Sequence, residues 1–167
     1  VPRAGAEQGR LEIVRDGAVY CEGERIVAVG PTKLLLRNFP KARKAKRIID
    51  ATGHAVIPGL VDCHSHPVFA GDRSDEYAMR LAGKSYREIL AAGGGILKSV
   101  KHTREATHAE LLASLCARLD SALAFGTTTL EAKTGYGLDE RTERKMLEVI
   151  GMAQGLSIST TPSLKRS

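Results

Sequence analysis

Two histidines, His64 and His66, lie two residues apart at the end of an apolar segment that begins at Ile57. If this segment is a strand, the spacing places both side chains on one face. Two neutral imidazoles on one face can share a divalent ion through nitrogens about 2.0–2.1 Å from it. The first hypothesis is therefore metal-assisted hydrolysis, and the alternative is a pair of ordinary histidines at a solvated strand end.

An arginine, Arg73, lies seven residues after the second histidine. Its planar guanidinium could bind the carboxylate of a substrate through two hydrogen bonds. The alternative is an exposed ion pair with a nearby acidic residue, Asp72, Asp75 or Glu76.

A tyrosine, Tyr136, has a glycine on each side within the segment 133–138. The two glycines permit a tight loop that projects the phenol, although an ordinary turn would have the same sequence.

The elements that must position these side chains change type along the chain. Alternating apolar residues predict a small antiparallel sheet over 11–30, with turns at 16–17 and 22–24. A short helix to about residue 38, a strand at 47–50, a turn at 52–53 and a strand over 55–62 follow. The hydrophobic period then changes after His66, which indicates a boundary between a small β module and an α/β region.

Helices and strands alternate in the second half. Helical periodicity predicts helices at 85–92, 107–125 and 139–154, and β-branched residues predict strands at 127–132 and 156–161. Thr107 with Glu110 fits a capping box, and Gly126 fits a helix stop. This order predicts parallel βα units, whose catalytic groups gather at the carboxyl ends of the strands. The histidine pair and the Tyr136 loop both lie at such ends.

Composition excludes several classes of function. With 43% apolar and 26% charged residues, the chain is predicted to be globular, and it has no apolar run of the ~20 residues that span a bilayer. We therefore expect a cytoplasmic protein with no membrane partner. Its three widely spaced cysteines are typical of reduced thiols. The start at Val1 favours a fragment or a processed product.

The net charge of +6 includes a basic run at 41–47, which could indicate an acidic partner such as nucleic acid. Only 4% of the residues are aromatic and none lies within this run, so the stacking surfaces that bind single strands are missing. We interpret the run as a solvated loop and expect no nucleic-acid partner.

Several segments resemble a known family. The segment 56–62 with His64 and His66 resembles the first barrel strand of the amidohydrolase superfamily, whose members begin with a small β module. Within that superfamily, the chain resembles the imidazolonepropionase family in four further segments, which are 68–73, 83–86, 92–96 and 135–138. The resemblance extends from about residue 11 to about residue 161.

The resemblance implies hydrolysis of the cyclic amide of 4-imidazolone-5-propanoate to N-formimino-L-glutamate, a step of histidine degradation. It implies one divalent metal, zinc or iron, that activates water. His64 and His66 match metal ligands of the family. Arg73 and Tyr136 match residues that contact the substrate, a small molecule with a carboxylate, and Tyr86 is a further match of this kind.

The resemblance also implies an α/β fold in the form of an incomplete TIM-type barrel. We expect a β-sandwich-like module over 1–55, about three barrel strands over 56–161 and a divergent tail over 162–167, because eight strands take about 250 residues. The family's third histidine, its metal-binding aspartate and its acid/base residues have no counterparts here, so no catalytic residue is assigned. We expect the chain alone to be inactive and prone to associate through an open strand edge.

Two alternatives to this function remain. One is a different amidohydrolase, such as a deaminase or a dihydropyrimidinase relative, which Arg73 and the 135–137 loop disfavour. The other is a non-catalytic product that binds a partner through its open edge. Residue types do not distinguish zinc from iron, since imidazole suits both. A homodimer like that of the family is compatible with the sequence but cannot be inferred from it.

Overall fold

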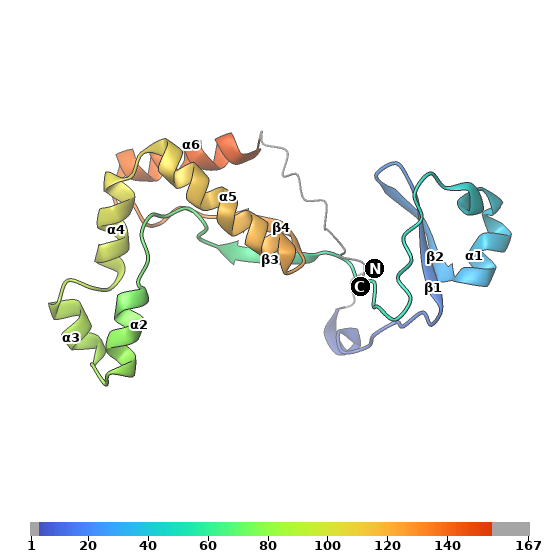
Figure 1. The fold of residues 1–167 in the computed structure, drawn as a ribbon, viewed down its shortest axis with the longest axis horizontal. Coiled ribbons are helices and arrows are strands. Elements are labelled where there is room, and N and C mark those ends of the chain that lie inside the picture. The colour runs from blue at the N-terminus through green and yellow to red at the C-terminus, as the bar shows by residue number, and fades with distance from the viewer. Residues whose placement is uncertain (1–3, 155–167) are drawn as a thin grey trace. The chain divides into compact units, whose positions relative to one another are not determined.

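The chain divides into two compact units, Val1–Val56 and Ile57–Ser167 (Figure 1). The structure is a computed structural model that describes residues 4–154. No helix in this described part of the chain is both long and apolar enough to cross a membrane.

The first unit contains an antiparallel hairpin of β1 (Gly17–Glu22) and β2 (Arg25–Pro31). The connecting turn contains Gly23, whose φ of +59° suits a glycine. The predicted small antiparallel sheet is therefore confirmed. Residues 11–15 lie before the first strand and form no part of it.

A short helix, α1 (Thr32–Asn38), follows β2 as predicted and contacts both strands of the hairpin. Its Leu35 is 5% exposed, and the rings of Tyr20 and Phe39 lie 5.7 Å apart between their centroids. A 3₁₀ helix, η2 (Pro40–Lys44), covers part of the basic run, and another, η1 (Gly5–Glu7), lies near the start of the chain.

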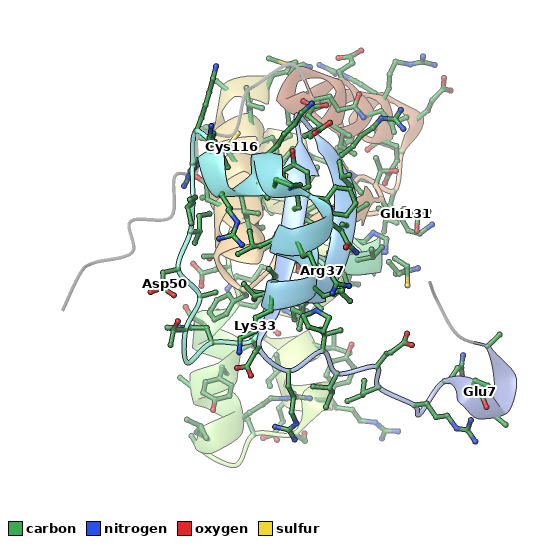
Figure 2. All side chains as sticks on the ribbon, turned by 90° about the vertical axis from the view of Figure 1, so that its right-hand side faces the viewer. Glu7, Lys33, Arg37, Asp50, Cys116 and Glu131 are labelled. Carbon is green, nitrogen blue, oxygen red and sulfur yellow. The ribbon has the colours of Figure 1, made fainter. Side chains whose placement is uncertain are left out.

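The strand predicted at 47–50 is wrong, because these residues form neither a strand nor a helix. Ile48 and Ile49 are mostly exposed at 71% and 61%. Branched side chains favour a strand where a neighbouring strand can pair with the backbone, and none does so here. The turn predicted at 52–53 is confirmed. Figure 2 shows Asp50 just before it and Lys33 and Arg37 on α1.

The second unit is built on two parallel strands, β3 (Leu60–Ser65) and β4 (Thr127–Ala132). The predicted strand at 127–132 and the predicted parallel pairing are confirmed. The predicted strand at 55–62 is placed too early, since β3 begins at Leu60. Pro58 has no backbone N–H to donate to a neighbouring strand, which explains the later start.

Helices occupy the connection between the two strands and follow β4 (Figure 1). Those predicted near 85–92, 107–125 and 139–154 are confirmed, whereas the helix after Arg73 and the helix after Gly95 were not predicted. In chain order the helices are α2 (Ser74–Leu81), α3 (Tyr86–Ala91), α4 (Ile96–Glu105), α5 (His108–Ala124) and α6 (Glu140–Gln154).

The core of this unit lies between α5 and α6. It contains the buried side chains of Val68, Leu111, Leu115, Met146, Val149 and Ala153. The predicted capping box begins α5, because the Thr107 hydroxyl accepts from the Glu110 backbone and the Glu110 carboxylate accepts from the Thr107 backbone. Val68 belongs to the segment that follows β3, so the same core anchors the chain just beyond the histidine pair.

The mixed α/β character of the prediction is confirmed, but residues 4–154 contain two-stranded sheets and no closed barrel. The strand predicted at 156–161 and the tail at 162–167 lie outside the described residues. In the parallel sheet, Leu60 and Val61 remain 50% and 67% exposed. Parallel strands are normally covered on both faces, so this sheet carries apolar surface that the described residues of its unit leave open.

Candidate active site

The two histidines lie at the carboxyl end of β3, where His64 belongs to the strand and His66 directly follows it. His64 is exposed and His66 is half-buried. Their ring centroids are 5.3 Å apart with an angle of 67° between the ring planes. Two imidazole nitrogens bound to one tetrahedral ion, each about 2.0–2.1 Å from it, leave the ring centroids about 5 Å apart. The observed separation is therefore compatible with a shared ion.

The tautomer of His66 is set by the loop after β4. Nδ1 of His66 lies 2.7 Å from the carbonyl oxygen of Thr134. A carbonyl only accepts, so Nδ1 carries the hydrogen, and in the neutral imidazole Nε2 is then the nitrogen with the free lone pair. This contact is of the kind that orients metal-binding histidines in other proteins. No local pattern predicts this contact, because the partners are 68 positions apart.

Glycine is required where this loop approaches His66. Gly135 has a φ of +136°, and a Cβ there would lie 3.1 Å from Cε1 of His66. Both the backbone conformation and the short distance disfavour a side chain at this position. The loop can therefore contact the imidazole closely, which brings Tyr136 beside it.

Tyr136 lies between the histidines and the segment that follows them. Its ring centroid is 5.9 Å from that of His66 and 5.3 Å from that of Phe69. Glu143 of α6 holds the loop, because one carboxylate oxygen accepts from the N–H of Gly137 at 2.7 Å and of Leu138 at 2.9 Å. Burial opposes ionisation of Glu143, but hydrogen bonds outweigh this effect and hold its pKa below the ordinary value.

Arg73 pairs with Glu76, its Nη2 lying 2.5 Å from Oε2, so the ion pair considered as an alternative is present. The hydrogen bond to Glu76 raises the pKa of Arg73, and the nearby Tyr86 and Tyr136 act in the same direction. Of the three predicted substrate-binding residues, Arg73 and Tyr136 line one cavity, whereas Tyr86 is not among its lining residues. Tyr86 itself is 53% exposed, with its hydroxyl close to Gly95.

A cavity of about 420 Å³ adjoins these residues. It is lined by Phe69, Gly71, Asp72, Arg73, Ser99, Arg118 and Tyr136. Arg73 and Tyr136 contribute to the same cavity, although 63 positions separate them in the sequence. A cavity with cationic and phenolic groups suits a small anionic ligand.

Sequence reasoning missed Arg118 of α5. Its Nη1 donates to the carbonyl oxygens of Pro67 and Phe69 at 2.9 and 3.0 Å, and its Cζ lies 3.6 Å above the ring of Phe69. Burial lowers the pKa of this guanidinium. A signal was present, because residue 118 continues the helical row of buried Leu111 and Leu115, where an apolar residue would be ordinary.

Within residues 4–154, no group of three or more His, Cys, Asp and Glu side chains is placed to hold a metal ion. The chemistry of the paired imidazoles fits a divalent ion, but the described residues supply only part of a coordination sphere.

No family model matches the chain. Three curated relatives that carry the name imidazolonepropionase are nevertheless close in sequence. The chain is 52% identical over 147 residues to the protein of Haloarcula marismortui, which covers 88% of the chain and 35% of the relative. It is 53% identical over 152 residues to the protein of Halobacterium salinarum. This match covers 91% of the chain and 36% of the relative. It is 50% identical over 150 residues to the protein of Chloroflexus aggregans. This match covers 90% of the chain and 34% of the relative.

The chain is therefore a relative of the imidazolonepropionases along about nine tenths of its length, and the predicted resemblance is confirmed. It spans about a third of the length of the curated relatives that it matches.

Proposed function

We propose that the complete protein hydrolyses the cyclic amide of 4-imidazolone-5-propanoate to N-formimino-L-glutamate, as the name of its relatives suggests. The observation that carries this proposal is the arrangement of His66. Its Nδ1 is fixed by Thr134, and its ring lies 5.3 Å from that of His64 and 5.9 Å from that of Tyr136, beside a cavity that contains Arg73.

His64 and His66 would hold one divalent metal, zinc or iron, and further ligands would complete the sphere. When bound, such a metal supplies Lewis-acid activation of the scissile carbonyl and of the attacking water. This chain contributes two imidazoles on one side of β3. The hydrogen bond from His66 to Thr134 keeps one of them in the tautomer that can act as a ligand.

The substrate would bind in the cavity between Arg73 and Tyr136. Arg73 uses one terminal nitrogen for Glu76 and has further N–H groups that could bind the propanoate. Tyr136 would orient the imidazolone ring next to His66, and Tyr86 would act from the side of Arg73. Together these groups favour a ligand that carries both a planar ring and a carboxylate.

The fold of the complete protein is proposed to be a TIM-type barrel, of which residues 56–161 form about the first three strands after a β module at 1–55. The exposed apolar residues of β3 support this, since further structure would cover them. The 167-residue chain by itself is proposed to be inactive, because the two histidines leave most of a metal's coordination sphere open.

Ligand binding tests this proposal on the chain itself. NMR titration with 3-(imidazol-4-yl)propanoate should shift the signals of Arg73 and Tyr136. The variant Arg73→Ala should bind roughly 10- to 100-fold more weakly, because two charge-assisted hydrogen bonds are lost. Arg144→Ala is the matched control, since this exposed arginine also pairs with a glutamate on its own helix.

Two results would count against the proposed binding site. One is unchanged affinity in Arg73→Ala. The other is equal affinity for 4-ethylimidazole, which has a similar ring but no carboxylate. Turnover of 4-imidazolone-5-propanoate by the purified 167-residue chain with stoichiometric metal would contradict the expected inactivity.

A further inference from the structure

Glu76 is a buried acidic residue at the edge of the proposed carboxylate site. It lies in the first turn of α2, and its side chain is only 7% exposed. Carboxylates are rarely buried unless they are paired and hydrogen-bonded. Both oxygens of Glu76 have partners, since Oε2 contacts Nη2 of Arg73 at 2.5 Å and Oε1 accepts from the N–H of Gly95 at 2.8 Å. Glu76 therefore joins Arg73 to the loop that begins α4.

The triple glycine of this loop is shaped around Glu76. Gly93 and Gly95 have φ values of +84° and +82°, which L side chains rarely adopt. A Cβ on Gly94 would lie 3.0 Å from the carboxyl carbon of Glu76 and 2.7 Å from Cγ2 of Ile89. The loop can therefore follow the carboxylate closely and donate a backbone N–H to it. The position of this carboxylate is thus fixed from two directions.

Arg73 is held on one side and open on the other. One terminal nitrogen contacts Glu76, while 41% of the side chain is exposed and the residue lines the cavity next to Tyr136. A free arginine side chain loses much rotamer freedom when it binds a ligand, and holding it in advance lowers this cost. The pair is thus arranged to restrict the guanidinium without occupying all of its donors.

We propose that Glu76 is a positioning residue that holds the guanidinium of Arg73 in the orientation that receives the carboxylate of the substrate. The inference rests on the proposed function of this cavity. It assigns Glu76 a role in ligand binding that differs from the effect expected of its negative charge. A carboxylate near an anionic ligand repels it, so its charge alone would weaken binding. Orientation of Arg73 has the opposite effect, and the two effects can be separated by experiment.

The substitution Glu76→Gln separates them. Glutamine keeps the volume and an acceptor for the N–H of Gly95, but it loses the charged contact to Arg73. Positioning predicts that the dissociation constant for 3-(imidazol-4-yl)propanoate rises roughly 3- to 10-fold. Charge repulsion predicts the reverse, a tighter complex. Unchanged or tighter binding by a folded Glu76→Gln variant would overturn the inference.

A double-mutant cycle with Arg73→Ala shows whether Glu76 acts through the arginine. In the Arg73→Ala background, Glu76→Gln should change the affinity less than twofold, because the group it positions is gone. An equal loss in both backgrounds would mean that Glu76 supports the fold in general, and the positioning role would be wrong.

A ligand-free readout covers the case in which Glu76→Gln does not fold or no variant binds the probe. NMR of the guanidinium nitrogens should show restricted rotation for Arg73 in the unchanged chain and fast rotation for the exposed Arg144. Fast rotation of Arg73 in the unchanged chain would refute the positioning role. Restricted rotation without any binding of the probe would support the contact and would count against the proposed function instead.

Discussion

Replacing Arg118 with methionine should destabilise the second unit and loosen the segment that follows the histidine pair. Arg118 donates to the carbonyl oxygens of Pro67 and Phe69 and covers the ring of Phe69. Methionine keeps the apolar stem of the side chain, so the loss comes mainly from the guanidinium. Phe69 in turn contacts Tyr136, which connects this arginine of α5 with the candidate site.

The size of the effect follows from three contacts. Each of the two hydrogen bonds contributes about 1 kcal/mol net to the free energy of unfolding. The guanidinium over the ring of Phe69 adds about 1 kcal/mol for a partly buried pair. The expected loss for Arg118→Met is therefore about 3 kcal/mol, or a fall of about 12 °C in the melting temperature of a unit of this size.

Urea unfolding followed by circular dichroism at 222 nm measures this loss, because the five α-helices in the described part of the second unit dominate the signal. Arg118→Lys should recover only part of the stability, since lysine keeps the charge but not the planar fork. Arg144→Met is the matched control and should cost less than about 0.5 kcal/mol, as its pair with Glu140 is exposed. If Arg118→Met and Arg144→Met unfold within about 1 kcal/mol of each other, the assigned role of Arg118 is wrong.

Three further predictions concern the same unit. Gly135→Ala should cost about 1–3 kcal/mol and shift the imidazole signals of His66, because the left-handed backbone and the 3.1 Å approach both disfavour a side chain; unchanged imidazole signals would contradict this. Thr107→Ala should lower stability by about 1 kcal/mol through loss of the capping box with Glu110, measured as a shift of the urea midpoint, and no shift would refute it. The hydrogen bond with Arg73 lowers the pKa of Glu76 below its ordinary 4.5. The ionised Glu76 side chain therefore stabilises the fold fully above pH 4.5, and this stabilisation is lost as the pH falls through the pKa of Glu76 in the folded protein. Urea midpoints should therefore fall more steeply below pH 4.5 in the unchanged chain than in Glu76→Gln, and parallel curves would contradict the pair.

Local patterns in the sequence predicted the elements that local forces determine. The hairpin β1–β2, the strand β4 and the helices α5 and α6 follow from periodicity, turn residues and the capping box at Thr107. The strand at 47–50 failed because no strand among residues 4–154 pairs with its branched residues, a condition that no local pattern reveals. The early start given to β3 overlooked Pro58, which lacks the N–H that a paired strand donates.

The sequence predicted which residues belong to the candidate site, but not the contacts that hold them in place. Arg73 and Tyr136 do line one cavity, yet the groups that hold them come from elsewhere in the chain. Glu76 was considered only as an exposed partner for Arg73, while its burial and its contact with Gly95 depend on how α2 meets the glycine loop. Contacts between residues far apart in sequence depend on the folded backbone, and spacing along the chain does not encode them.

Binding of zinc to the histidine pair tests the proposed metal site most directly. Isothermal titration should show one weakly bound Zn²⁺ per chain, and the site should disappear in His64→Ala and in His66→Ala. His54→Ala is the matched control, because Nδ1 of His54 also lies 3.0 Å from a backbone carbonyl oxygen, that of Thr52. The substitution His54→Ala should leave the number of Zn²⁺ ions bound per chain unchanged. Zinc binding that survives both His64→Ala and His66→Ala, or that is abolished by His54→Ala, would contradict a metal site at His64 and His66.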